Sequence, residues 1–193
     1  MEDQFIEEQT FKNKDFSELG FKKGEYELCT FLNCNFLNSD LSKARFVDCE
    51  FYDCNLSSTH LLQTGFQNVL FKNCKMLGLQ FDKCSNFGFL INVDNCHLNY
   101  ASFFKRNLSK IVFKNTKLQD VDFTECDLTS AVFENCNLQN AIFKNTNLQN
   151  TDFRSSSNFT IDPENNNIKG AKFTLDTVVG LLTKYNIKIE SNF

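Results

Sequence analysis

The 193-residue sequence contains no tryptophan, one proline and only seven glycines. Proline and glycine dominate flexible linkers and low-complexity tails, so their scarcity favours one continuous domain over tethered modules. No apolar run approaches the about 18 residues of a membrane-spanning helix, and the N-terminal stretch MEDQFIEEQT is acidic where a secretory signal peptide would be basic and then apolar. We therefore expect a cytoplasmic protein with no membrane partner.

In place of these features, the sequence carries a large apolar residue at every fifth position. A helix repeats every 3.6 residues and a strand every second residue, so neither produces this period. Each five-residue unit must contain a short extended piece and a corner that returns its central side chain to the same interior, which predicts a solenoid. In the second half of the chain the central residues are Leu98, Phe103, Leu108, Phe113, Leu118, Phe123, Leu128, Phe133, Leu138, Phe143, Leu148 and Phe153.

The same period runs through the first half in a different phase. Its centres are Phe11, Phe16, Phe21, Tyr26, Phe31, Phe36, Leu41, Phe46, Phe51, Leu56, Leu61, Phe66, Phe71, Met76 and Phe81. A small residue usually stands two positions before each centre, and Asn or Asp recurs just before it. Asn or Asp also recurs two positions after the centre, where a short polar side chain can bond the neighbouring backbone and form a corner.

The resulting pattern, small residue, Asn or Asp, Leu or Phe, and two variable residues, resembles that of pentapeptide-repeat proteins over roughly residues 9–175. The resemblance implies an all-β fold, a right-handed quadrilateral β-helix in which four pentapeptides form one square coil. With about 4.8 Å between stacked backbones, we expect about eight coils between Phe11 and Phe173 in a rod about 40 Å long. Since the Leu/Phe alternation has a period of ten, Phe should occupy two opposite faces of the second half and Leu the other two.

Nine cysteines raise the question of disulfides or a metal site. The register answers it, because the cysteines stand at the small inward position and are expected to be reduced and buried. Cysteines spaced by twenty should stack about 4.8 Å apart, which is too far for good disulfide geometry. No C-x-x-C motif occurs either, so we expect no metal. The positions are Cys29, Cys34, Cys49, Cys54, Cys74, Cys96, Cys126 and Cys136, with Cys84 joining them if Asn86 counts as a centre.

The register slips around residues 84–97, because Leu98 follows Phe81 by seventeen residues instead of fifteen. Gly88 lies among extra apolar side chains in this segment and suggests a bulge or kink. One interpretation is an irregularity that faces a binding partner. The alternative is an insertion tolerated at a coil corner. The apolar residues concerned are Phe87, Phe89 and Leu90.

Arg106 is the clearest exception to the small residue before each centre, and it belongs to the same irregularity. A buried guanidinium without partners would be very costly. We therefore expect Arg106 either to turn outward and open the corner or to pair with a carboxylate such as Asp94.

The period of five ends near residue 175, so we assign residues 1–175 to the β-helix and residues 176–193 to a C-terminal segment. A helical stripe of apolar residues, preceded by Asp176 or Thr177 as a cap, predicts a short α-helix. One such helix cannot hide all of this surface against the last coil, so we expect a homodimer through it. The expected interface residues are Val178, Val179, Leu181, Leu182 and Tyr185.

The sequence offers no catalytic constellation. It contains no G-x-x-x-x-G-K-[ST], G-x-S-x-G or H-E-x-x-H motif. The two histidines, His60 and His97, each precede a centre and should point outward, as solvated surface residues do. Carboxylates such as Asp122 and Asp127 lie five residues apart, on different faces, which is poor geometry for paired acid and base chemistry. We expect neither enzyme activity nor a cofactor.

Within the pentapeptide-repeat family, a regular coil followed by GAKFTLDTVVGLLTKYNIKIE resembles the Qnr-type quinolone-resistance proteins. This resemblance implies a dimeric rod that mimics duplex DNA, binds DNA gyrase or topoisomerase IV, and protects it from fluoroquinolones. Many Qnr proteins carry long loops that project from the coils, whereas no insertion longer than two residues fits the register here before Phe153.

The charge pattern provides an independent test, since a DNA mimic should present an acidic field. The net charge of −4 lies in residues 1–30, which hold 8 acidic and 4 basic residues, while the other charges balance. A nucleic-acid-binding protein would need a basic stripe and outward aromatic residues, so we expect no direct contact with nucleic acid. The alternative to the Qnr-like rod is a general scaffold for an unknown protein partner, without resistance activity.

Overall fold

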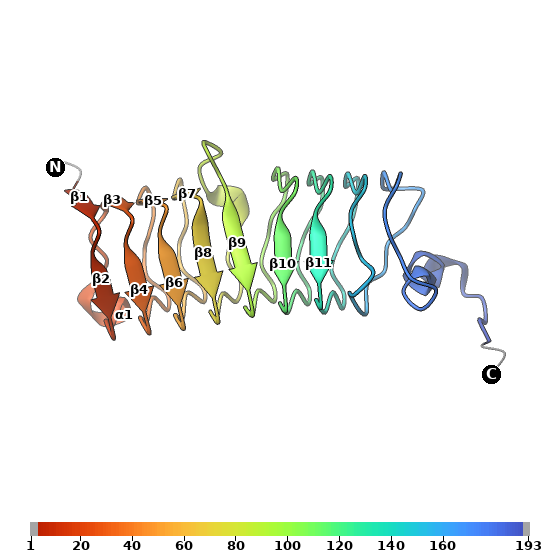
Figure 1. The fold of residues 1–193 in the computed structure, drawn as a ribbon, viewed down its shortest axis with the longest axis horizontal. Coiled ribbons are helices and arrows are strands. Elements are labelled where there is room, and N and C mark those ends of the chain that lie inside the picture. Colours follow the sequence, from red (N-terminus) through yellow and green to blue (C-terminus); the bar gives the residue numbers. More distant parts are fainter. Residues whose placement is uncertain (1–3, 191–193) are drawn as a thin grey trace.

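The computed structural model describes residues 4–190. It is a parallel β-solenoid in which the chain winds into a long stack of similar turns, with the N- and C-termini at opposite ends of the rod (Figure 1). Stacked strands pair with residues one turn away, so Phe11 lies beside Phe31, and Phe31 lies beside Phe51. This spacing of twenty is four five-residue units per turn.

Two parallel sheets follow two sides of the rod. The seven-stranded sheet contains β2 (Thr10–Lys12), β4 (Thr30–Leu32), β6 (Glu50–Tyr52), β8 (Val69–Lys72), β9 (Ile91–Asp94), β10 (Val112–Lys114) and β11 (Val132–Glu134). The four-stranded sheet contains β1 (Gln4–Glu7), β3 (Gly24–Glu27), β5 (Arg45–Val47) and β7 (Gly65–Gln67). The helices within residues 4–190 are short: α1 (Phe16–Leu19) and the 3-10 helices η1 (Phe81–Lys83), η2 (Val178–Leu181) and η3 (Thr183–Tyr185).

About seven turns carry regular strands, and the eighth coil predicted from the sequence is not confirmed. Beyond β11 the pairing continues only as isolated bridges, such as that between Asp152 and Lys172. The reason is local, because Asn158 and Pro163 stand where large apolar centres would be expected. Without those side chains, the last part of the chain cannot fill the core as the earlier turns do.

The corners have left-handed backbone, as the recurring Asn and Asp residues predict. Asn33, Asp53 and Asn73 each lie two residues after a centre and have φ of 50°, 55° and 57°. Asn and Asp tolerate this conformation better than other residues with a Cβ atom. Their side chains also form ladders along the rod, as where Asn73 donates to Asp53 at 3.1 Å. These polar ladders hold successive corners in register.

The core is built from stacked phenylalanine rings, and the predicted placement of Phe on two opposite faces is confirmed. Phe123 stacks between Phe103 and Phe143, with ring centroids 5.5 and 5.3 Å away and ring planes nearly parallel. Phe113 and Phe133 form the opposite ladder, 5.3 Å apart, and meet Phe123 edge to face. Each ring therefore contacts others within its own turn and in the turns above and below.

All nine cysteines are buried and free, and those spaced by one turn lie in a column. Their thiols donate to backbone carbonyls, as Cys34 does to Phe11 at 3.4 Å and Cys54 to Phe31 at 3.4 Å. The Cys34 amide in turn donates to the sulfur of Cys54. Burial raises the pKa of Cys49 to about 12, so this thiol remains protonated at neutral pH.

The C-terminal segment differs from the prediction. In place of an α-helix, the chain forms a turn and then the two 3-10 helices, η2 and η3. Gly180 explains the difference, because its Cα packs against the ring of Phe159 and a Cβ there would lie 2.5 Å from that ring. The segment follows the end of the core instead of completing regular helical turns. Residues 191–193 of the assigned segment, like residues 1–3 of the assigned β-helix, lie outside the described residues.

Candidate protein-binding surfaces

The functional surface of this rod lies on its outside, because the interior is filled with side chains. Within residues 4–190 there is no group of three or more His, Cys, Asp or Glu placed to hold a metal ion. The helices of this part of the chain are also too short to span a bilayer. Three features interrupt the regular exterior: a loop at residues 85–90, the C-terminal end, and an asparagine-lined hollow.

The loop at residues 85–90 contains the two residues that break the register. Val69 of β8 pairs with Ile91 of β9, twenty-two residues later instead of twenty. The extra length projects beside β8 and β9, beyond the neighbouring corners (Figure 1). Phe87 is 74% exposed and Leu90 49% exposed at the surface of this loop. Gly88 has φ of 63° and lies against the side chain of Gln67, where a Cβ would be too close.

Arg106 holds this loop from inside. Its side chain is buried, and Nε donates to the carbonyl of Phe81 at 2.7 Å. Nη1 donates to the carbonyl of Ser85 at 3.2 Å, and Nη2 donates to the carbonyl of Cys84. The expectation that Arg106 turns outward or pairs with Asp94 is therefore wrong. Backbone carbonyls released by the irregular turn satisfy the guanidinium instead.

Asn86 explains why a guanidinium fits at this place. It stands where a large apolar centre would point inward, twenty residues before Arg106, and its Oδ1 accepts from Nη1. Phe89 turns back and covers the guanidinium, with its ring centroid 4.7 Å from Cζ. Burial lowers the pKa of Arg106, while Cys84 and Asp82 oppose that effect. Two exceptions to the repeat, spaced by twenty residues, were the sequence signal for this contact, and sequence reasoning did not join them.

The C-terminal segment covers the end of the core. Phe159 is buried between Phe153 and Phe173, with ring centroids 5.2 and 5.8 Å away. The amide of Ile161 donates to the carbonyl of Gly180 at 3.0 Å, which joins the last coil to η2. The end is thus sealed by one ring and one backbone contact.

Ion pairs fasten the same segment to the turn at residues 162–167. Lys184 reaches Asp162 at 2.6 Å and Glu164 at 2.7 Å, and the hydroxyl of Tyr185 donates to Glu164 at 3.1 Å. These bonds to Lys184 lower the pKa of Asp162 and, together with the bond from Tyr185, that of Glu164. Both carboxyls are therefore charged at neutral pH. We name the contacts of Lys184 and Tyr185 with Asp162 and Glu164 the C-terminal clamp.

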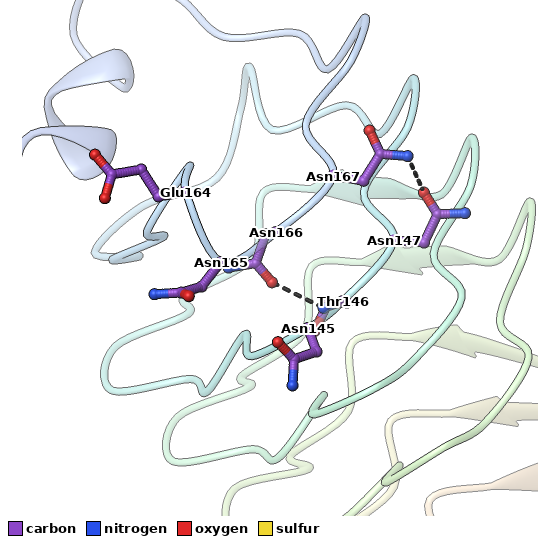
Figure 2. Close-up of a pocket in the computed structure, with 7 residues that line it drawn as sticks. All are labelled: Asn145, Thr146, Asn147, Glu164, Asn165, Asn166 and Asn167. Carbon is purple, nitrogen blue, oxygen red and sulfur yellow. Dashed lines mark hydrogen bonds between the residues drawn. The ribbon is translucent and has the colours of Figure 1, made fainter.

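An asparagine-lined hollow lies beside this clamp (Figure 2). Asn166 Oδ1 accepts from the amide of Thr146 at 2.9 Å, and Asn166 Nδ2 donates to the carbonyls of Phe143 and Asp162. Asn167 donates to Asn147 at 3.0 Å. Because these amides bond to one another and to the backbone, the hollow supports the turn that presents Glu164 to Lys184.

The outer side of the C-terminal segment is apolar. Of the residues expected at a dimer interface, Val179 and Tyr185 are exposed, while Val178, Leu181 and Leu182 are half-buried. The structure adds three exposed residues that the helical stripe did not include, Leu175, Ile187 and Ile189. Leu182 and Val179 line a shallow depression with Ile187 and Ile189. We name these eight residues, the five expected at the interface and the three added by the structure, the C-terminal apolar surface.

Some of the charges on the long sides of the rod are paired between neighbouring turns. Arg45 contacts Glu25 at 2.8 Å, and Lys114 contacts Glu134 at 3.4 Å. Such exposed pairs contribute little stability, but they cancel the field on these faces. The result is a mixed surface with no continuous acidic side.

This geometry defines a class, the parallel β-solenoids built from five-residue units, whose surfaces serve as interaction scaffolds. The family model described as "Pentapeptide repeat region" matches residues 6–81, 25–103 and 90–157. The chain therefore belongs to the pentapeptide-repeat family. A comparison of the sequence with curated proteins finds no significant match.

Solved structures share the fold. QnrB1 (full length), described as a plasmid-mediated fluoroquinolone resistance protein, matches 95% of this chain and 100% of its own, with 19% identity and a TM-score of 0.56. HetL, a pentapeptide-repeat protein involved in heterocyst differentiation regulation from the cyanobacterium Nostoc, matches 86% of this chain and 84% of its own, with 14% identity and a TM-score of 0.43. At these identities the likeness concerns the fold.

Proposed function

We propose that this protein is a non-enzymatic, homodimeric interaction rod that binds a type II topoisomerase, gyrase or topoisomerase IV, in place of duplex DNA and so protects it from fluoroquinolones. The observation that supports this most is the likeness to QnrB1 along 95% of this chain and all of QnrB1. Since the long faces carry balanced charge, the rod resembles DNA through its shape and length rather than through an acidic field. This proposal places the protein in the cytoplasm.

The proposed dimer is formed by the C-terminal apolar surface. Leu175 is 91% exposed, and Val179, Ile187 and Ile189 are exposed around one shallow depression. An apolar patch of this kind at the end of a solenoid is a typical interaction surface. In a two-fold arrangement the same patch meets itself, so a single substitution acts twice.

Light scattering after size exclusion tests the dimer. The wild-type chain should elute with twice the single-chain mass of 22.3 kDa. Leu182→Asp should produce monomers, because it places two like charges in an apolar interface. Leu62→Asp is the matched control, since Leu62 is exposed on a coil far from the C-terminal end. A wild-type mass near 22.3 kDa contradicts the dimer, and a dimeric Leu182→Asp variant contradicts this interface.

The proposed topoisomerase contact includes the loop at residues 85–90. Phe87 and Leu90 offer apolar side chains on a loop that Arg106 holds in place, so little ordering is required on binding. A gyrase supercoiling assay with and without ciprofloxacin tests the function. The protein should preserve supercoiling in the presence of the drug, and the double variant Phe87→Ala/Leu90→Ala should preserve less. The control Leu62→Ala removes an exposed apolar side chain elsewhere.

A second candidate is a scaffold for another protein partner without resistance activity. The paired charges on the long faces favour it, because a DNA mimic would be expected to attract the basic groove of a topoisomerase. Unchanged inhibition of gyrase by ciprofloxacin, with no binding of the rod to gyrase, would support this candidate and exclude the first.

A further inference from the structure

One side of the rod carries three basic side chains in a single column over three consecutive turns. Lys75 bridges His97, and His97 bridges Lys117, in parallel register. The backbone fixes this spacing, since the amide of His97 donates to Cys74 and that of Lys117 to Cys96, both at 2.9 Å. With about 4.8 Å per turn, the outer two residues lie about 10 Å apart along the rod.

These three side chains have no acidic partner within residues 4–190. None of the ion pairs in this part of the chain involves Lys75 or Lys117, although both are exposed. Asp94, three residues before His97 in the chain, is engaged elsewhere, because it contacts Lys72 at 3.9 Å and accepts from Asn115. The column therefore brings three basic side chains together on consecutive turns without a counter-charge from the described chain.

We propose that the column Lys75, His97 and Lys117 is a docking surface for an acidic segment of a partner protein. Charge complementarity decides the occupant, since carboxylates would provide the counter-charges that the chain itself does not. An extended peptide places alternate side chains on one side about 6.7 Å apart. Two carboxylates of such a peptide, lying along the rod, can each bridge two members of the column. The inference does not depend on which protein the loop or the rod binds.

Nucleic acid fits this surface poorly. A phosphate backbone requires a long basic stripe, whereas this column spans three turns only. The neighbours in the same column, Asn55 and Asn137, are uncharged, so the positive charge ends after three turns. Its length suits a short acidic peptide better than a continuous line of phosphates.

His97 makes the docking dependent on pH. Its imidazole is half-buried, and burial, followed by the charges of Lys117 and Lys75, lowers its pKa. Lys117 and Lys75 are the charged groups that act on His97, while Asp94, three residues before it in the chain, is paired with Lys72. A bound carboxylate stabilises the imidazolium and raises the pKa of His97. Binding then takes up a proton and should tighten as the pH falls through the lowered pKa of His97.

The test is an NMR titration of the two imidazoles of the full chain. The probe is an N-acetylated hexaglutamate peptide, with a hexaglutamine peptide as its neutral control. We expect hexaglutamate to raise the pKa of His97 by about half a unit or more. His60 is the internal reference, because it lies in a different column, between Asp40 and Gln80. Its titration should not respond to the peptide.

Matched variants decide whether the column is responsible. Lys75→Gln/Lys117→Gln should abolish the response of His97, whereas Lys110→Gln/Lys144→Gln removes the same charge from other faces and should retain it. No response of His97 in the wild type, or equal loss in both double variants, overturns the proposal. A larger response to a 12-base-pair DNA duplex than to hexaglutamate would assign the surface to nucleic acid and also overturn it.

Discussion

Arg106 lies twenty residues after Asn86, and its guanidinium donates to the side-chain oxygen of that residue. Each residue breaks the repeat where it stands, since Asn86 replaces a large apolar centre and Arg106 replaces a small inward residue. Arg106 is buried under the ring of Phe89, while Asn86 is exposed and reaches the guanidinium from the loop. The irregular loop is thus held in place by specific hydrogen bonds to Arg106.

Replacing Arg106 tests that conclusion. Arg106→Met leaves the carbonyls of Phe81, Cys84 and Ser85 without their donor, and we expect a loss of about 3 kcal/mol of unfolding free energy. Chymotrypsin should also cleave after Phe87 faster, because the loop is released. Arg154→Met is the control, since Arg154 is exposed and pairs with Asp152 in its own turn, so its loss should leave the unfolding free energy nearly unchanged. Equal losses of unfolding free energy in the two variants would contradict the conclusion that Arg106 holds the loop.

The stacked rings should dominate the stability of the rod. Phe123 is fully buried between Phe103 and Phe143, and Phe123→Ala should lower the unfolding free energy by about 3–5 kcal/mol. Thermal melting should move by about 6 °C or more. Ile142→Ala is the control, because Ile142 is 51% exposed on the outside. A shift below about 2 °C for Phe123→Ala would refute the stacked core.

Corner residues other than Asn, Asp and Gly are strained. Lys110 has φ of 63°, whereas Asn150 occupies the corresponding corner two turns later with φ of 57°. Lys110→Asn should raise the unfolding free energy by about 0.5–1 kcal/mol, because Asn adopts left-handed backbone more readily. Lys144→Asn, next to a corner but not among the positive-φ residues, should not stabilise. Urea denaturation of the three proteins measures both changes; a destabilised Lys110→Asn variant would contradict the argument.

Acid should loosen the C-terminal clamp. The pKa values of Asp162 and Glu164 are lowered in the folded protein, so their contribution to stability is complete above the ordinary values of 3.8 and 4.5 and is lost as the pH falls through the lowered values. Hydrogen exchange of the Ile161 amide, which bonds to Gly180, should accelerate in that range beyond its intrinsic pH dependence. In Asp162→Asn/Glu164→Gln this extra dependence should disappear. Asp176→Asn should retain it, and its loss there would contradict the clamp.

Much of the fold could be predicted because the repeat is local. Phe113 and Phe133 stand twenty residues apart, so one turn of four units superimposes them, and the structure shows their rings stacked. The corners follow from the same reasoning, since Asn33 and Asn73 supply the left-handed backbone that the corner of a five-residue unit requires. Candidate surfaces were harder to predict, because an exposed residue such as Phe87 interrupts the pattern without indicating where its side chain points.

The sequence by itself determined the solenoid, its turn of twenty residues and the content of its core, because each five-residue unit repeats the same pattern of small, polar and large apolar residues. Only the tertiary structure decided the contacts that the repeat does not contain. Arg106 finds carbonyl partners because a turn one level below it has been lengthened. The C-terminal segment forms 3-10 turns because Gly180 meets Phe159, a ring brought to the end of the rod by the preceding coil. Both outcomes depend on residues that are distant in the chain and adjacent only after the coils have stacked.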